Sequence, residues 1–288
     1  MKFTLSLAFC EAADLCTLAR AAEHAGFAMV SLSDHVVHPR KIGTKYPYTH
    51  DGSLRWEPFT DWPDVWVAIG AMAAVTEHIR FTTSVFVLPL RNVFSVAKSV
   101  ATAAVISRDR VALGIGVGWM REEFELLGQD FKTRGRRADE MIEVLRVLWA
   151  GGWVSFRGDY YDFDELEMSP VPAEDIPIYV GGISERALYR AATHGDGWCS
   201  DIHTTDDLKR ILTELRRLRA DSARAEQPLQ VLAACADAFD VDGYKRIGDI
   251  GVTHTMTMPW YIYGGGDSIE GKCDAIKRFG DDVIARFE

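Results

Sequence analysis

The residues best suited to chemistry are Asp34 and His35, which follow a short apolar run at residues 27–32. An imidazole titrates near neutral pH and a carboxylate beside it can orient it, so the pair could act in general acid–base catalysis. Asp34 could equally cap backbone groups at a strand end, beside an ordinary polar histidine. Adjacent strand residues point to opposite faces, so at most one faces inward unless the backbone turns. We favour the functional interpretation because the pair closes a strand.

A second candidate site is the turn Gly181-Gly182-Ile183-Ser184, which lies between a buried run and a predicted helix. Glycines let the backbone approach an anion closely, and a helix start offers free N–H groups and the positive end of its dipole. The turn could therefore hold a phosphate. It could equally be a tight strand-to-helix turn in which Ser184 caps the helix. The sequence alone supports both interpretations.

The sequence lacks the motifs that usually mark metal sites and catalytic nucleophiles. The eight histidines form no His-x-His or His-Glu-x-x-His motif, and no Gly-x-Ser-x-Gly elbow is present. The five cysteines are scattered and show neither metal spacing nor a disulfide framework. We therefore expect no metal centre and a reducing, cytoplasmic environment.

The composition and net charge of the chain indicate which kinds of molecule it is expected to bind. The chain has 288 residues, 48% of them hydrophobic, and a net charge of −10, which disfavours nucleic acid and anionic membranes. The apolar residues near the N-terminus alternate, which is typical of a first strand rather than of a signal peptide. No run of 18 apolar residues is present to span a membrane. A small organic molecule is the expected partner.

The elements that must position these residues alternate regularly between strands and helices. Eight apolar strands separated by amphipathic helices predict an α/β fold, a (β/α)8 TIM barrel forming a single domain over residues 1–288. Insertions are expected after strands 2 and 4 and before strand 5. The expected strands are residues 2–8, 29–32, 79–88, 111–117, 176–180, 197–200, 229–236 and 252–258.

A doubly wound open sheet is the competing fold, and its cofactor fingerprint would be Gly114-Ile-Gly116-Val-Gly118-Trp119. That fingerprint requires a third glycine where Trp119 stands, so the barrel is favoured. In such barrels catalysis takes place at the carboxyl ends of the strands. Those ends are rich in aromatic residues and glycine, which suits a flat aromatic cofactor.

Two further segments each allow two interpretations. The aromatic insertion at residues 36–62 is either a lid or a loop packed on the outside of the barrel. The cluster Arg134-Gly-Arg-Arg137 either binds an anionic tail or is solvated and paired with Asp139 and Glu140.

At the strand ends, the chain resembles the bacterial luciferase-like monooxygenase superfamily, in its coenzyme F-420 (deazaflavin, F420) dependent class. The resemblance covers nearly the whole chain. The matching segments are residues 25–27 and 33–35, 83–85 with 88–89, 113–119, 122–124, 127–128, 134–135, 139–140, 178–182, 184–187, 195–198, 278–279 and 283–284.

This resemblance implies positions for the cofactor. Asp34 and His35 would line the deazaflavin head, and Ser84-Val85 would carry a non-proline cis peptide that forms a bulge behind the ring. The phosphate of the tail would be held by the glycine turn, through Gly181, Gly182, Ile183 and Ser184.

One position departs from the family pattern. Some sugar-phosphate dehydrogenases of this class carry a glutamate acid where this chain has Trp119, and an indole cannot transfer a proton. That substrate and mechanism are therefore not supported. His35 or Glu122 is the expected alternative acid.

The expected function is hydride transfer between F420 and an organic substrate. The alternatives are an FMN-dependent monooxygenase that uses reduced FMN and oxygen, and a catalytically silent barrel that only binds a flavin or a partner. A homodimer is expected from apolar residues on a barrel helix, namely Ile69, Met72 and Ala73.

Overall fold

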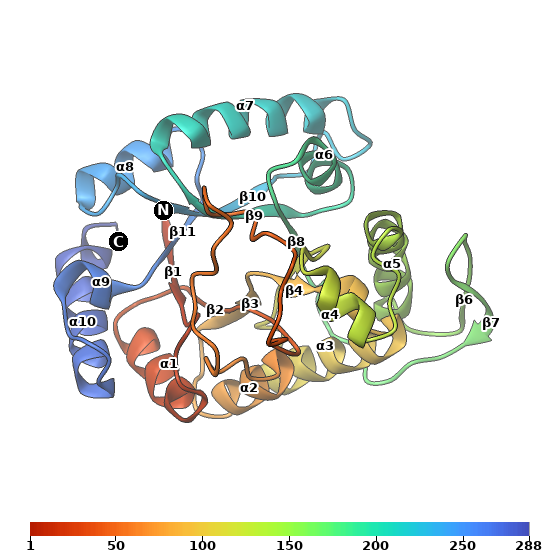
Figure 1. Cartoon of the computed structure of the whole chain (residues 1–288), viewed down its shortest axis with the longest axis horizontal. Helices are drawn as coiled ribbons and strands as arrows, with labels where there is room; N and C mark the ends of the chain where they lie inside the picture. Colours follow the sequence, from red (N-terminus) through yellow and green to blue (C-terminus); the bar gives the residue numbers. More distant parts are fainter. Residues whose placement is uncertain (288) are drawn as a thin grey trace.

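The computed structural model describes residues 1–287 and shows a parallel sheet that curls into a nearly closed barrel inside a ring of helices (Figure 1). The sheet order is β3-β2-β1-β11-β10-β9-β8-β5-β4. Its strands are β1 (Lys2–Ser6), β2 (Met29–Leu32), β3 (Arg80–Thr83), β4 (Phe86–Val87), β5 (Leu113–Gly116), β8 (Ile178–Gly181), β9 (Gly197–His203), β10 (Gln230–Cys235) and β11 (His254–Thr257).

The nine sheet strands found within residues 1–287 amount to eight barrel strands, because β3 and β4 are two parts of one. The predicted third strand at 79–88 is interrupted at the Ser84–Val85 peptide, which is cis. A bridge between Phe81 and Val111 joins β3 to the segment that leads into β5 and brings the two sides of the sheet together. The predicted barrel is therefore confirmed.

Ten α-helices within the described residues follow or flank the strands. They are α1 (Leu15–His24), α2 (Val65–Ala73), α3 (Val93–Ser107), α4 (Arg121–Leu126), α5 (Arg134–Trp149), α6 (Glu185–Thr193), α7 (Thr205–Ala220), α8 (Val241–Asp249), α9 (Pro259–Tyr263) and α10 (Ile269–Asp282). Short 3-10 turns occupy Ala12–Asp14, Leu88–Leu90 and Ile284–Arg286. No helix within residues 1–287 is long and apolar enough to cross a membrane.

Several boundaries differ from the predicted ones. Strand β1 ends at Ser6 rather than at residue 8, and strand β9 continues to His203 rather than ending at residue 200. An antiparallel hairpin forms from β6 (Val154–Arg157) and β7 (Asp162–Leu166) and projects from the side of the barrel in Figure 1. Asp64 caps α2 by accepting from the backbone N–H groups of its first turn.

Two apolar layers hold the barrel together. Residues that point into the barrel form a small core of Met29, Ala112, Tyr179, Cys199 and Leu232. A much larger core fills the space between the strands and the helix ring. The strands are buried on both faces, which explains why they are nearly continuous apolar runs in the sequence.

The three residues expected to form a dimer contact do not lie on the surface. Ile69, Met72 and Ala73 lie on the inner side of α2 and are buried in the larger core of this same chain. They are therefore not available to a second copy. The expectation of a homodimer itself remains a prediction.

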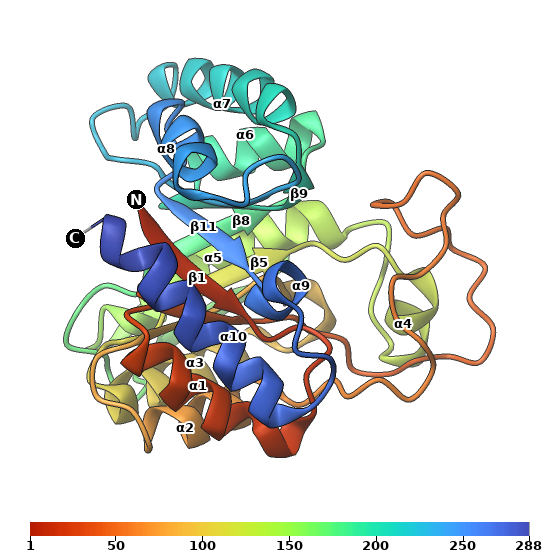
Figure 2. The same ribbon diagram turned by 90° about the vertical axis from the view of Figure 1, so that its left-hand side faces the viewer.

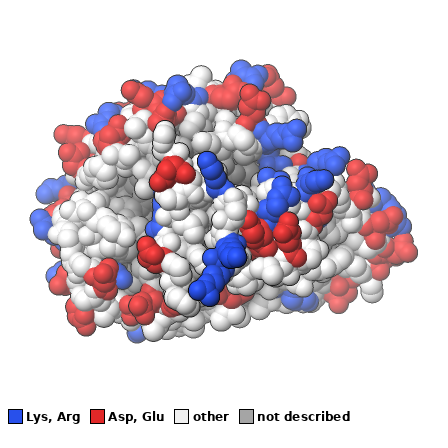
Figure 3. Space-filling view, in the orientation of Figure 1, with Lys and Arg blue, Asp and Glu red and all other residues white. Residues whose placement is uncertain are grey.

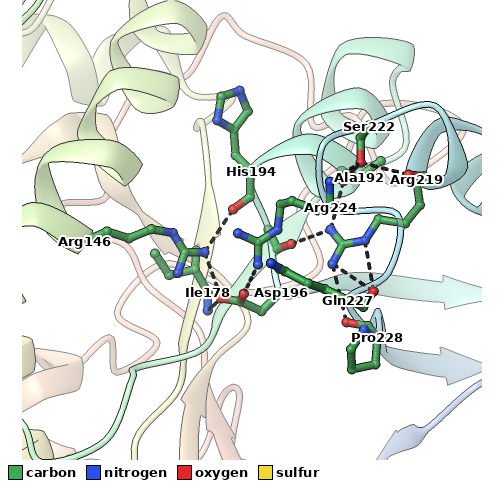
Figure 4. A network of polar contacts seen from close by, with 11 residues as sticks. Arg146, Ile178, Ala192, His194, Asp196, Arg219, Ser222, Arg224, Gln227 and Pro228 are labelled. Atoms are coloured by element: carbon green, nitrogen blue, oxygen red, sulfur yellow. Dashed lines mark hydrogen bonds and ion pairs between the residues drawn. The ribbon is translucent and has the colours of Figure 1, made fainter.

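A polar network closes the amino-terminal end of the barrel, opposite the strand ends that carry chemistry (Figure 4). Asp196, just before β9, accepts from the backbone N–H of Ile178 at 2.8 Å and from Arg146 of α5 at 2.9 Å, and it also pairs with Arg224. Arg219 of α7 is buried and donates to two backbone carbonyls at the end of α6, each at 2.9 Å. These contacts tie α5, α6 and α7 to neighbouring strands.

Replacing Asp196 by Asn should lower the free energy of unfolding by about 2 kcal/mol, because an amide cannot accept on both sides and loses its charge toward two arginines. Denaturant unfolding followed by circular dichroism measures this. Asp206→Asn on the exposed side of α7 is the matched control and should change stability little. Equal stability of the two variants would contradict the structural role of Asp196.

Candidate active site at the barrel mouth

The carboxyl ends of the barrel strands, which we call the mouth, all face one side of the molecule. Figure 2 shows that the insertion (residues 36–62) and α4 stand together beyond this end. Figure 1 looks onto the same end, with the insertion in front of the strands. The residues predicted to be functional at different strand ends are therefore brought to one face.

The Ser84–Val85 bulge forms the floor of the mouth. Its peptide is cis, as the sequence resemblance implied. The Ser84 N–H donates to the Leu32 carbonyl at 2.7 Å, and the Ser33 hydroxyl donates to the Ser84 carbonyl at 3.0 Å. The Val85 side chain packs against the small core inside the barrel.

Two glycines on neighbouring strands make room for Val85. A Cβ on Gly116 would lie 2.5 Å from Val85 Cγ2, and one on Gly181 would lie 2.6 Å from Val85 Cγ1. Both distances are far below van der Waals contact, so any larger residue at either position displaces Val85. Glycine is therefore needed at both strand ends to leave space for Val85. Gly181 also begins the glycine turn.

Gly116→Ala should destabilise the fold by about 1–3 kcal/mol because its methyl overlaps Val85. Adding Val85→Ala should recover part of this loss, since Gly116 has no other neighbour within contact distance. Thermal unfolding of the two single variants and the double variant measures the coupling. Gly70→Ala in α2, where a methyl meets nothing within 4 Å, is the control for an added methyl without a clash and should stabilise the fold by about 0.5–1 kcal/mol. Additive effects would contradict the direct clash.

His35 lies in the mouth and is held by Glu123 of α4. His35 Nδ1 is 3.1 Å from Glu123 Oε2, and the other carboxylate oxygen accepts from the backbone N–H groups of Val36 and Val37 at 2.6 and 3.3 Å. Burial acts to raise the pKa of Glu123, but the hydrogen bond and charge of His35 outweigh it, so the pKa is lowered. Glu123 therefore stays ionised and fixes the imidazole through Nδ1, which leaves Nε2 for a ligand.

Glu122, the expected alternative acid, has a different position. Its carboxylate accepts from the backbone N–H groups of Gly43 and Thr44 at 2.7 and 3.0 Å and from the Thr44 hydroxyl at 2.9 Å. Against a raising effect of burial, these hydrogen bonds lower the pKa of Glu122. The geometry thus favours Glu122 as an anchor of the insertion and disfavours it as a proton donor.

The Asp34 carboxylate forms all of its hydrogen bonds with groups of this chain. Both carboxylate oxygens accept from the Arg91 guanidinium, at 2.5 and 2.6 Å, and one also accepts from the Val87 N–H at 2.9 Å. The Asp34 side chain is only 1% exposed. Asp34 therefore anchors strand β4 and Arg91, and its expected contact with a cofactor ring remains a prediction. Nothing in the sequence marked Arg91 as its partner.

The glycine turn forms the start of α6 as predicted. Gly182 has a φ of +109°, a conformation suited to glycine, and the Ser184 hydroxyl accepts from the Ala187 N–H at 3.2 Å. Ile183 and Ser184 are exposed. The Trp198 indole donates to the Gly182 carbonyl at 2.8 Å and fixes the turn from below. The turn is a capped helix start, and its expected contact with an anion remains a prediction.

Arginines gather beside this turn. Arg121 and Arg134 both stack on Phe131, with the guanidinium carbons 4.4 and 3.7 Å from the ring centroid. Burial, and then the charges of Arg121 and Arg190, lower the pKa of Arg134. Figure 3 shows Lys and Arg side chains gathered on this face between the positions of α5 and α6. The positive charge suits an anionic group at the turn.

The expected pairing of Arg134 and Arg137 with Asp139 and Glu140 is wrong. Arg134 donates to the carbonyls of Gly118 and Phe131, and Arg137 donates to the Thr133 hydroxyl and to backbone carbonyls. Asp139 pairs instead with Arg190, and Glu140 accepts from the backbone of the β6–β7 turn.

Aromatic residues of the insertion pack over His35. The ring centroids of Trp56 and Trp62 lie 5.1 and 4.9 Å from that of His35, and Trp119 lies at 6.0 Å. Tyr46 contacts both Trp56 and Trp119. The indole N–H groups of Trp56 and Trp62 are buried without a hydrogen-bond partner. The insertion therefore covers the mouth and does not pack outside the barrel, and it brings unused donors beside the imidazole.

The rim of the mouth is apolar. Figure 3 shows this face hollowed and largely uncharged away from the arginines. Exposed apolar side chains follow most of the barrel strands, namely Phe9, Val36, Val37, Ile183, Ile202, Phe239 and Tyr261. Such a rim suits an organic ligand. Within residues 1–287 no three His, Cys, Asp or Glu side chains lie close enough together to hold a metal ion.

Comparison with known proteins shows the family to which the chain belongs. The sequence model of the family described as luciferase-like monooxygenase matches residues 4–239. The chain belongs to this family. Its relatives include an uncharacterised protein of Mycobacterium tuberculosis, 34% identical over 99% of this chain and 100% of that protein. Another is the F420-dependent glucose-6-phosphate dehydrogenase of Nakamurella multipartita, 29% identical over 82% of this chain and 66% of that protein.

Solved structures share the fold of this family member. The F420-dependent tetrahydromethanopterin reductase of Methanopyrus kandleri superposes with a TM-score of 0.76 over 100% of this chain and 99% of that one, at 16% identity. The oxygenating constituent of 3,6-diketocamphane monooxygenase from Pseudomonas putida, in complex with FMN, gives 0.61 over 81% and 66%, also at 16% identity. The family's members are oxidoreductases and monooxygenases, so this chain is an enzyme of that kind.

Proposed function

We propose that this luciferase-like protein is an F420-dependent oxidoreductase that transfers hydride between the deazaflavin and an organic alcohol or carbonyl compound. The observation that carries the proposal is the His35–Glu123 pair at 3.1 Å. A hydride transfer from an alcohol must also remove the hydroxyl proton, and a fixed imidazole at the mouth supplies a group for it. Oxygen activation on a reduced flavin does not by itself call for such a pair.

The residues of the mouth fit a planar ring with an anionic arm. The Val85 bulge provides a floor that any Cβ on Gly116 or Gly181 would disturb. The glycine turn and the start of α6 offer N–H groups for a phosphate, and Arg121 and Arg134 add positive charge beside it. FMN would use the same floor and turn, so these features alone do not choose between the two cofactors.

Side chains of the protein would carry out proton transfer and orient the substrate. F420, when bound, supplies the hydride acceptor or donor. His35 takes the proton of a substrate hydroxyl at Nε2 as the C–H electron pair leaves, and a carbonyl bond forms. Glu123 stabilises the imidazolium that results. The indole donors of Trp56 and Trp62 lie beside His35 and can orient the substrate oxygen, while the aromatic cover excludes water.

Binding of F420 and of FMN, each titrated and followed by fluorescence, tests the cofactor. We expect tight F420 binding and weaker FMN binding. Tight FMN binding without F420 binding would replace the proposal by the FMN-dependent monooxygenase. Binding without turnover, across alcohols, carbonyl compounds and oxygen, would favour the catalytically silent barrel.

With an alcohol that reduces F420, His35→Ala should lower kcat by about 100-fold or more, because it removes the group that takes the proton. Glu123→Gln should lower kcat in the same direction but by less, since it removes only the orienting charge. Glu125→Gln on the exposed side of α4 is the matched control and should retain activity. Unchanged steady-state rates for His35→Ala would contradict its role as the acid–base group.

A further inference from the structure

We propose that residues 45–55 of the insertion, which we call the lid, move as one unit over the mouth and that the ion pair between Arg55 and Asp201 is the latch that holds them closed. The inference concerns access to the site of the proposed function, but its primary test needs no cofactor.

The latch joins opposite sides of the mouth. One Arg55 nitrogen donates to both oxygens of Asp201 at 2.7 Å, and the other donates to the Tyr48 carbonyl within the lid at 2.6 Å. Asp201 belongs to β9, 146 positions further along the chain. The Arg55 guanidinium also lies 5.8 Å above the centre of the Tyr46 ring. A single side chain thus connects the lid to the far wall of the barrel.

The lid is organised by its own hydrogen bonds. The Tyr46 N–H donates to the Gly52 carbonyl at 3.0 Å, and the Thr49 hydroxyl donates to the Ser53 carbonyl at 2.7 Å. The N–H and hydroxyl of Ser53 both donate to Asp51, at 3.0 and 2.7 Å. A compact loop of this kind keeps its shape when it moves.

The segments on either side of the lid are anchored independently. Glu122 binds residues 43 and 44, Glu123 binds residues 35 to 37, and Asp61 accepts from the Ala12 N–H at 2.9 Å. Among residues 1–287, the polar contacts that link the lid itself to the rest of the chain are those of Arg55 with Asp201. Opening therefore requires this one ion pair to break and Tyr46 to leave its contacts with Trp56 and Trp119.

The ion pair that forms the latch is weak enough to break and re-form. The side chains of Arg55 and Asp201 remain 32% and 25% exposed, and a partly exposed pair is a weak, salt-screened bond. In the closed lid Tyr48 is half-buried, and this burial, followed by the charges of Asp201 and Cys199, raises the pKa of that phenol. Closed, the lid therefore places aromatic side chains above the barrel core, where a ligand must enter.

Hydrogen–deuterium exchange of the free protein tests the lid. Asp201→Asn should speed exchange in residues 45–55 by about two- to fivefold, the range expected from losing one partly exposed pair. Exchange in the β6–β7 hairpin should not change. Asp162→Asn, which breaks an exposed pair with Arg157 in that hairpin, is the matched control and should leave the lid unchanged. Arg55→Gln should reproduce the effect of Asp201→Asn.

Equal lid exchange in wild type, Asp201→Asn and Arg55→Gln would overturn the latch. Stopped-flow association of F420 separates this outcome from failure of the proposed function. We expect Asp201→Asn to raise the association rate by about two- to fivefold as well. If F420 binds neither protein while lid exchange still differs, the latch stands and the assignment of F420 fails. If F420 binds both at one rate and lid exchange is equal, the latch is wrong and F420 stands.

Discussion

The close approach of Val85 to Gly116 and Gly181 is the contact on which the rest of the site depends. It brings a bulged strand, β5 and β8 together at the point where the barrel closes. The same contact sets the floor of the mouth and leaves the glycine turn free to begin α6. Because the neighbours are backbone atoms of two strands, the floor is rigid, and a rigid floor is what positions a planar ligand.

Two consecutive carboxylates on α4 hold two different parts of the mouth in place. Glu123 faces inward, is buried and holds His35, whereas Glu122 faces the insertion and holds residues 43 and 44. Adjacent residues on a helix point about 100° apart, so one short helix can serve an imidazole and a loop at once. The chemistry and its cover are therefore positioned by the same element.

The two ends of the barrel use charge differently. At the amino-terminal end, the buried Arg219 donates to backbone carbonyls and the half-buried Arg224 pairs with Asp196. At the mouth, arginines stack on Phe131 or form partly exposed pairs, and two indole donors have no partner. The two indole donors beside His35 are therefore available to a ligand at the mouth.

The sequence by itself determined the barrel, because eight strands buried on both faces must be apolar runs separated by amphipathic helices. It also offered Ser184 as the cap of α6. Local residue type is enough for these features, as it is for the glycine turn. By contrast, only the tertiary structure decided that Glu123 and not Glu122 holds His35, that Asp34 is occupied by Arg91, and that Arg55 reaches Asp201. These partners lie 57 to 146 positions apart, and their pairing depends on how the barrel closes, which no local pattern encodes.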